Sequence, residues 1–342
     1  PNGKYRADLY HNRLVFRQGE LPAAAAASQA AGAGSGETSY MYDALHDDGS
    51  YKFVETERVH FHAFERLDYS RTRVRDPHRR LVWDRLVTFL RDENVFLIAD
   101  WVQSEADQTL TAANLWHTHD VERLGPGALR TRIPFIHRRP GCRDPYRNRE
   151  DKALLIEFPG SQRRIGWERI RRNYGDAAMI YEAESRTFRK GETACFVTVL
   201  TPVDAGESPQ GRLGRAKVAL LTERHDLLCL TYAGNRETTL AYKLDLDKGL
   251  KSEAETGGDA LRYDWESGKM NYGGIVTDAD FAFVERGQER TAYGFLNGTA
   301  LYDGEKRLFS VPKYSTYDFE TKEWKPAASK WRSWEDEEEI RK

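Results

Sequence analysis

A histidine and an asparagine stand next to each other near the start of the chain, within the apolar stretch RADLYHNRLVF. The imidazole of His11 can act as a general base or bind a metal ion, and the amide of Asn12 can donate hydrogen bonds to a carboxylate. The apolar residues around the pair predict a β-strand, in which neighbouring side chains point to opposite faces. We therefore expect His11 to face a site and Asn12 to bond neighbouring backbone. A purely structural histidine is the alternative.

Four more histidines form two His-x-His pairs, His60 with His62 and His117 with His119. Alternate residues of a strand share a face, so each pair can present two imidazoles to one metal ion. The sequence identifies no third ligand for either pair. Hydrogen bonding on a polar strand face is therefore the main alternative.

Arginines are concentrated in three segments, RTRVRDPHRR, HRRPGCRDPYRNR and QRRIGWERIRR. A guanidinium binds a carboxylate or a sulfate through a bidentate fork, so these segments can line a groove for an acidic glycan. Arg79 and Arg80, at the end of the first segment, are our candidates for substrate binding. The alternative is that the arginines pair with the many Asp and Glu residues on neighbouring strands.

The composition limits the class of protein. The chain has 342 residues, 39% of them hydrophobic and 31% charged, and its formal net charge is −2. A net charge this small provides no large field for nucleic acid, and no apolar run reaches the roughly 20 residues of a membrane helix. We therefore expect neither nucleic acid nor a membrane as a partner. Cys142, Cys195 and Cys229 form neither a disulfide framework nor a zinc motif, and the last two lie in apolar runs typical of a core.

Short apolar segments rich in aromatic and β-branched residues recur along the chain, with Gly, Pro, Asp or Asn between them. This pattern predicts an all-β protein, a large antiparallel β-sandwich of stacked sheets. We place the main sandwich at residues 1–202 and an acidic tail at 331–342. Further strands at 203–330 form either a second layer or a small C-terminal β-domain. The Ala-rich segment at 22–37 predicts a flexible surface loop, and QRRIGWERIRRNYG predicts a short helix or a loop.

An ordered series of short motifs, from roughly residue 3 to residue 202, resembles the C-terminal β-sandwich of the heparinase II/III-like polysaccharide lyases. GKYRADLYHNRLVF is similar to the family's His-Asn strand. RTRVRDPHRRLVWDRLVTFLRDENVFLIADWVQSE is similar to its Arg-rich strand and the apolar strand that ends in Asp. ANLWHTHDVERL resembles its aromatic-His strand, and CFVTVLTP the last strand of its main sandwich. Arg13 departs from the pattern, since many members have Thr or Ser there.

The resemblance implies roles for particular residues. In the family, an N-terminal α/α toroid carries the tyrosine and the other main catalytic groups, and the sandwich adds a histidine and, in some members, a metal site. The resemblance thus implies His11 and Asn12 as catalytic residues, and His11 as a ligand of a divalent metal such as zinc. The family's other metal ligands precede the His-Asn strand, and this sequence begins after them. The resemblance also implies that Trp116 and His117 bind substrate.

The implied activity is β-elimination on a uronic-acid-containing polysaccharide, a glycosaminoglycan or alginate, by a periplasmic or extracellular enzyme. The expected partners are this acidic polysaccharide and the toroid domain of the same protein. The isolated chain is expected to be inactive, because its sequence holds no toroid. Two alternatives stay open. One is a non-catalytic carbohydrate-binding or structural β-sandwich, and the other is a relative of the uronyl C5-epimerases, since proton abstraction at C5 serves both reactions.

Overall fold

The computed structural model of the protein confirms the predicted all-β class, with antiparallel sheets throughout. In the part of the chain that it describes, the helical segments are α2 (Tyr40–Leu45) and the short turn η3 (Pro209–Gly211). No helix of this part is long and apolar enough to cross a membrane. The segments at 22–37 and 331–342, His119 and Cys142 lie outside the described residues. These are 11–21, 40–45, 54–118, 120–132, 152–172, 175–204, 206–220, 227–246, 250–251, 262–263, 270–288 and 290–326.

The chain forms two compact units, one made of residues 1–61 and 66–214 and the other of residues 62–65 and 215–342. The boundary proposed from the sequence at residue 202 falls inside the strand β12 (Thr193–Asp204). The short segment 62–65, which begins with the last two residues of β2 (Glu55–Ala63), belongs to the second unit. Nothing in the local sequence of this segment distinguishes it from the strands around it.

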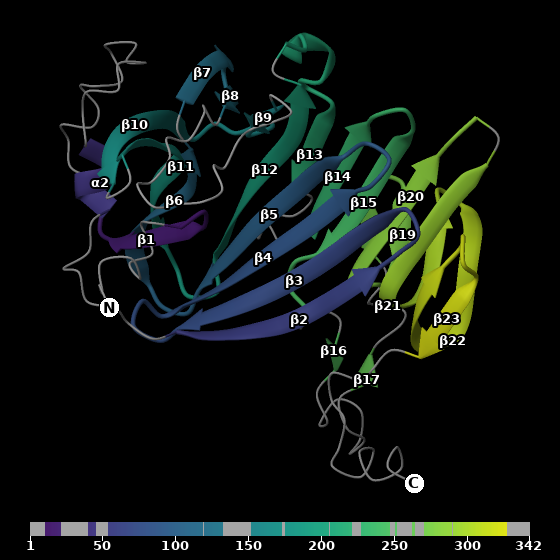
Figure 1. Cartoon of the computed structure of the whole chain (residues 1–342). Helices are drawn as coiled ribbons and strands as arrows, with labels where there is room; N and C mark the ends of the chain where they lie inside the picture. The colour runs from purple at the N-terminus through teal and green to yellow at the C-terminus, as the bar shows by residue number, and fades with distance from the viewer. Residues whose placement is uncertain are drawn as a thin grey trace, which may run out of the picture. The chain divides into compact units, whose positions relative to one another are not determined.

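The first unit contains a four-stranded and an eight-stranded antiparallel sheet (Figure 1). The four-stranded sheet has the order β1 (Leu14–Gln18), β6 (Gln108–Thr118), β11 (Gly175–Phe188), β10 (Arg164–Arg172). The eight-stranded sheet has the order β2 (Glu55–Ala63), β3 (Leu67–Asp76), β4 (Leu81–Leu90), β5 (Val95–Ser104), β12, β9 (Lys152–Glu157), β8 (Ala128–Arg132), β7 (Asp120–Gly125).

The core of the first unit lies between these two sheets. Ala112 and Trp116 of β6 pack there against apolar side chains of the eight-stranded sheet, whereas Ala113 and Leu115 pack on the opposite face, beneath α2. Successive strand residues point to opposite faces, so Asn114 also points into the sandwich. A buried amide in this position needs hydrogen-bond partners, and the polar contacts described below supply some of them.

The predicted strand around the His-Asn pair begins later than the sequence suggests. Residues 11–13 form a bend, and β1 starts at Leu14. The physical reason is the side chain of Asn12, whose Oδ1 accepts a hydrogen bond of 2.8 Å from the backbone N–H of His117. In a longer β1, the N–H of His117 would bond to a backbone carbonyl of β1. The Asn12 side chain accepts this bond instead, and the pairing of β1 with β6 ends there.

The segment QRRIGWERIRRNYG is neither a helix nor a loop, because most of it forms β10, which pairs with β11. Ile165 and Trp167, two positions apart, both pack against the interior cluster of the sandwich. Spacing of two is the period of a strand, and the pairing with a distant segment outweighs the local preference for a helix.

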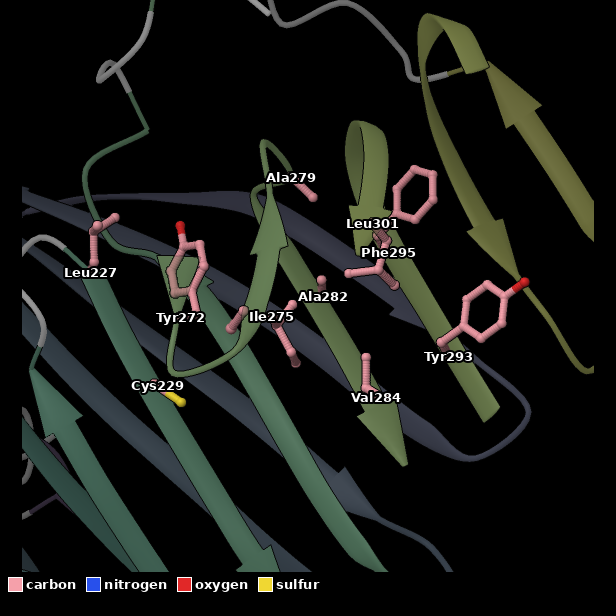
Figure 2. Packing of buried hydrophobic residues seen from close by; sticks show 11 residues of the cluster. Leu227, Cys229, Tyr272, Ile275, Ala279, Ala282, Val284, Tyr293, Phe295 and Leu301 are labelled. Carbon is pink, nitrogen blue, oxygen red and sulfur yellow. The ribbon is translucent and has the colours of Figure 1, made fainter. Parts of the chain in front are cut away.

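The second unit is built on one nine-stranded antiparallel sheet, and Figure 2 shows its packed apolar face. Tyr272 and Ile275 lie in the same buried cluster as Cys229, Val284 and Phe295. The strands are β13 (Ala216–Leu220), β14 (Leu227–Ala233), β15 (Glu237–Lys243), β20 (Phe281–Arg286), β21 (Thr291–Asp303), β19 (Ile275–Thr277) and β18 (Met270–Tyr272) in this order, then β22 (Lys306–Asp318) on β21, and β23 (Glu323–Pro326) on β22; β16 (Leu250–Lys251) and β17 (Arg262–Tyr263) form a separate pair.

The two described cysteines are core residues, as the sequence predicts. Cys195 of β12 is buried in the first unit and Cys229 of β14 in the second. Burial raises the pKa of the Cys195 thiol to about 12. The thiolate is the reactive form of cysteine, so Cys195 is not a nucleophile at neutral pH.

Candidate functional site

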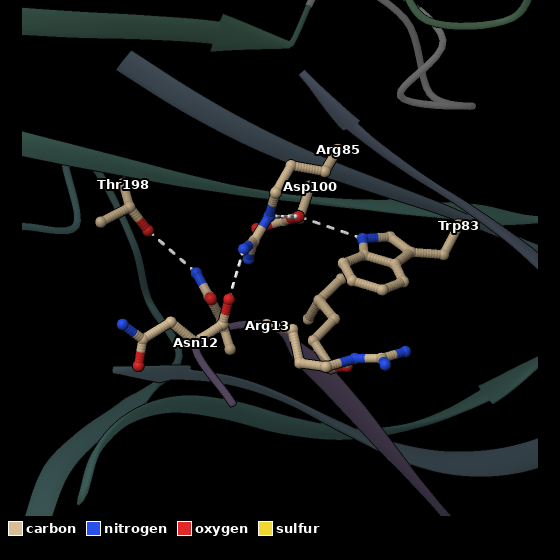
Figure 3. Close-up of polar contacts among 8 residues, drawn as sticks. Asn12, Arg13, Trp83, Arg85, Asp100 and Thr198 are labelled. Atoms are coloured by element: carbon tan, nitrogen blue, oxygen red, sulfur yellow. Dashed lines mark hydrogen bonds and ion pairs between the residues drawn. The ribbon is translucent and has the colours of Figure 1, made fainter. Parts of the chain in front are cut away.

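A group of polar residues forms a rim where the chain enters β1 beside the end of β6. Asn12 bonds to His117 as described, and Arg85 Nη1 donates a hydrogen bond of 2.5 Å to the carbonyl oxygen of Asn12 (Figure 3). His11 and Asn12 are exposed, while Arg13, Arg85 and His117 are partly buried. We call these five residues the β1 rim. It combines imidazole, amide and guanidinium groups, which suit the binding of a carboxylate or sulfate.

Arg85 is oriented by Asp100, the residue directly opposite it in the pairing of β4 with β5. Arg85 Nε donates to Asp100 Oδ1 at 2.7 Å and Nη2 donates to Oδ2 at 2.9 Å, which is a bidentate pair. Trp83 Nε1 also donates to Oδ1, at 3.0 Å (Figure 3). Asp100 is fully buried, whereas the Arg85 side chain keeps 18% of its surface exposed. The carboxylate therefore holds the guanidinium from below, and part of the guanidinium reaches solvent.

Two tryptophans lie beside the arginines of the rim. The guanidinium carbon of Arg13 is 4.8 Å from the ring centre of Trp83, and that of Arg85 is 5.5 Å from the ring centres of both Trp83 and Trp116. A cation at this distance over an aromatic face is attracted by the ring quadrupole. These contacts limit the freedom of both guanidinium groups and keep them at the rim.

A second set of polar side chains lies deeper, between the two sheets. Asn114 Nδ2 donates to Thr198 Oγ1 at 2.9 Å, and both residues are fully buried. Glu182 stands directly opposite Asn114 in the pairing of β11 with β6. Its Oε1 accepts hydrogen bonds from Ser161 Oγ at 2.5 Å and from Arg163 Nη1 at 3.4 Å.

Glu182 is a candidate for a carboxyl group that keeps its proton. Burial raises its pKa, and the charge and hydrogen bond of Arg163 together with the hydrogen bond from Ser161 offset only part of that effect. Glu182 Oε2 and Asn114 Oδ1 have no partner among the described residues. Since the two side chains are neighbours across the sheet, a protonated Glu182 is suited to donate to Asn114 Oδ1.

Replacing Glu182 with glutamine is expected to raise the free energy of unfolding by about 1 kcal/mol at about pH 8, since an amide donates without needing a proton. The folded-state pKa of Glu182 is raised above its ordinary value of 4.5. The stability that Glu182 contributes is therefore complete below that ordinary value and is lost as the pH rises through the folded-state pKa. Urea unfolding of both proteins at about pH 4 and about pH 8 measures the change.

The matched control for this change is Glu184→Gln on the same strand. The Glu184 side chain is 25% exposed and pairs with Arg163 at 3.1 Å, so it should show no gain in stability at high pH. A Glu182→Gln variant whose stability relative to wild type does not change with pH would contradict the protonated carboxyl.

The structure gathers four of the six candidate residues of the sequence in one place. His11, Asn12 and His117 belong to the β1 rim, and Trp116 lies beside Arg85. Trp116 is 7% exposed and packs among apolar residues of the interior, so its indole ring is not available as an open stacking surface. His11 is exposed rather than buried in the core of the sandwich.

Arg79 and Arg80 lie elsewhere in the first unit. Arg79 pairs with Asp76 at 2.8 Å, and its carbonyl oxygen accepts a hydrogen bond of 2.9 Å from Gln108, the first residue of β6. His117 is near the other end of the same strand, about 30 Å away at the usual rise of a strand residue. Arg80 is exposed in the turn between β3 and β4, with a φ of 51°. The two arginines are therefore not part of the β1 rim.

A metal site is not assembled in the described part of the chain. No three His, Cys, Asp or Glu side chains gather there in a group that could hold a metal ion. Among the described residues, His11 is therefore not part of such a group, and neither are His60 and His62 of β2. Zinc binding by His11 stays a prediction from the resemblance, and no chemical step below depends on a metal.

The sequence reading missed Trp83, Arg85 and Asp100, which carry most of the contacts at the rim. A signal for them was present in the segments LVWDRLVTFL and VFLIADWVQS. A charged residue within an almost wholly apolar strand needs a partner, because an unpaired buried charge is very unfavourable. A short turn separates these two segments, which predicts a hairpin. The expected partner of Asp100 is therefore a basic residue on the preceding strand, LVWDRLVTFL.

No protein-family model matches the chain, and no curated protein matches it. Some solved structures are similar at a low level. Heparan sulfate lyase HepC from Pedobacter heparinus matches with 16% identity and a TM-score of 0.39, over 56% of this chain and 28% of that chain. A heparinase III structure matches with 12% identity and a TM-score of 0.39, over 55% and 27%. The galactosidase domain of an α-galactosidase-sucrose kinase matches with 11% identity and a TM-score of 0.29, over 44% and 27%. The chain thus spans less than a third of each of these proteins.

Proposed function

We propose that this chain is the β-sandwich portion of a polysaccharide lyase that cleaves a uronic-acid-containing polysaccharide by β-elimination. The observation that carries the proposal is the β1 rim, where an exposed imidazole and an exposed amide lie beside two guanidinium groups. The ordered motifs from GKYRADLYHNRLVF to CFVTVLTP, which resemble the sandwich of the heparinase II/III-like lyases, give the rim its context.

The chemistry of the rim fits the demands of the reaction. Removing the proton at C5 of a uronate needs a base, and the charge that develops toward the carboxylate needs nearby donors or cations. The imidazoles of His11 and His117 are the groups of the rim suited to accept a proton, and His11 is the exposed one of the two. Asn12 Oδ1 is occupied by the backbone of His117, so its Nδ2 is the end of the amide that can donate to a substrate. The guanidinium groups of Arg13 and Arg85 supply positive charge.

The proposal includes a partner domain and a location. The tyrosine and the remaining catalytic groups come from an α/α toroid of the same protein, and the complete enzyme works in the periplasm or outside the cell. The rim supplies part of the catalytic set and binds the acidic polymer. It follows that the 342-residue chain should not cleave a uronate polymer without the toroid.

Replacing His11 with alanine tests the proposal in the complete protein. The rate of formation of the unsaturated uronate product should fall by about a hundredfold or more, as expected for loss of a general acid or base. The unfolding temperature should not change, because His11 is exposed and precedes β1. The substrates are hyaluronan, heparan sulfate, chondroitin and alginate, and the product is followed by its ultraviolet absorbance.

The other results of this experiment separate the alternatives. Binding of these polymers without any cleavage by the complete protein would indicate a carbohydrate-binding sandwich. Exchange of the C5 proton with deuterium from solvent, without chain cleavage, would indicate an epimerase. Turnover by the 342-residue chain alone would show that the catalytic set is not divided between two domains.

A further inference from the structure

Arg85 keeps unused hydrogen-bond donors at the rim. A guanidinium has five N–H groups. One on Nε and one on Nη2 are donated to Asp100, and one on Nη1 to the carbonyl oxygen of Asn12. The described residues offer no further acceptor to Arg85, so one N–H on each terminal nitrogen remains. The Arg85 side chain is 18% exposed, so it is not sealed off from solvent.

The surroundings of Arg85 provide more donors than acceptors. Both carboxylate oxygens of Asp100 are already used by Arg85 and Trp83. The buried Trp116 Nε1 has no acceptor in the described part of the chain, and the guanidinium carbon of Arg85 is 5.5 Å from the Trp116 ring. A surplus of donors around a fixed positive charge is the arrangement that binds an oxyanion, either directly or through a bridging water.

We infer that Arg85 is the residue of the β1 rim that binds a carboxylate of the glycan, and that Asp100 is its positioning residue. This inference rests on the proposed function and gives the acidic group of the substrate a specific partner. Asp100 holds one edge of the planar guanidinium, which leaves the terminal nitrogens directed at the ligand. Arg85 is therefore a stronger candidate for this contact than Arg79, which lies outside the β1 rim, by the opposite end of β6 from His117.

The test compares Arg85→Lys with Arg80→Lys in the 342-residue chain. Both changes keep the net charge and remove a planar fork, so long-range electrostatics are the same in the two variants. The probe is a hyaluronan hexasaccharide, whose acidic groups are carboxylates. Isothermal titration should show that Arg85→Lys weakens its binding by about tenfold or more, the effect of losing one charge-assisted hydrogen bond. Arg80→Lys should bind like the wild type.

A second measurement keeps the test valid if the Arg85 variant is unstable. In the wild-type chain, the indole N–H resonances of Trp83 and Trp116 should shift during titration with the hexasaccharide, because both rings contact the Arg85 guanidinium. A hexasaccharide whose carboxylates are reduced to alcohols should not bind, and it should not shift the two indole N–H resonances. Equal binding of the acidic and the reduced hexasaccharides would overturn the role of Arg85 as a carboxylate receptor.

The failure of this inference differs from the failure of the proposed function. If Arg85→Lys bound the acidic hexasaccharide as tightly as the wild type does, the inference about Arg85 would be overturned. The proposal of a β-sandwich that binds an acidic glycan would remain. Absence of binding by the wild-type chain to the hexasaccharide and to heparan sulfate, chondroitin and alginate fragments would overturn both.

Discussion

Asp84→Asn is expected to lower the free energy of unfolding by about 3 to 5 kcal/mol, because it removes the carboxylate that pairs with two buried arginines. Asp84 Oδ2 accepts hydrogen bonds from Arg71 Nε at 2.6 Å, from Arg71 Nη2 and from Arg73 Nη2, and Oδ1 accepts one of 2.7 Å from Arg73 Nε. Arg71 and Asp84 are fully buried, and Arg73 nearly so. Without the carboxylate, the two guanidinium charges lose the counter-charge that they share in the interior.

The cluster of Asp84 with Arg71 and Arg73 also predicts that the free energy of unfolding depends on pH. Burial tends to raise the pKa of Asp84, but the charges and hydrogen bonds of Arg71 and Arg73 outweigh it, and the net effect lowers the pKa below the ordinary value of 3.8. The stability that Asp84 contributes is therefore present above that ordinary value and is lost as the pH falls through the folded-state pKa. The difference between wild type and Asp84→Asn should shrink in acid, as measured by urea unfolding across that range.

Asp92→Asn is the matched control for Asp84→Asn. Asp92 also pairs with an arginine, Arg66, at 2.8 Å, but its side chain is 60% exposed. An exposed ion pair contributes at most about 1 kcal/mol, since water solvates both charges when the pair is broken. Similar losses in the two variants would show that the buried cluster is not more important for stability than a surface pair.

Asp100→Ala is expected to lower the free energy of unfolding by about 3 kcal/mol, the lower end of the range for breaking a buried ion pair. The change removes the acceptor of two Arg85 hydrogen bonds and of the indole N–H of Trp83, and Arg85 keeps its bond to the carbonyl oxygen of Asn12. The penalty is smaller than at Asp84 because Arg85 is 18% exposed and can turn toward water. Urea unfolding followed by tryptophan fluorescence measures the loss directly.

Asp68→Ala provides the comparison for Asp100→Ala. Asp68 pairs with Arg91 at 2.5 Å, and the two side chains are 33% and 39% exposed. Its loss should lower the free energy of unfolding by no more than about 1 kcal/mol. If Asp100→Ala were as stable as wild type, Asp100 would not be the group that fixes Arg85, and its assignment as a positioning residue would be wrong.

The sequence by itself determined the fold class. Strands such as LVWDRLVTFL and VFLIADWVQS are visible as apolar runs of strand length bounded by turn residues, because burial on a sheet face follows local periodicity. The pairing of these two strands is also local. Arg85 and Asp100 meet across one hairpin, so their ion pair was within reach of sequence reasoning. Cys195 was recognised as a core residue for the same reason, since its neighbours are apolar.

Only the tertiary structure decided how the His-Asn segment is used. The partner of β1 is β6, with Leu14 opposite Asn114, and this pairing joins segments far apart in the sequence. It sets where β1 begins and lets the Asn12 side chain bond to the backbone of His117. The register also places Glu182 opposite Asn114 inside the sandwich. A strand's own residues specify which face is apolar, but the choice of a distant partner and its register depends on how the whole unit packs.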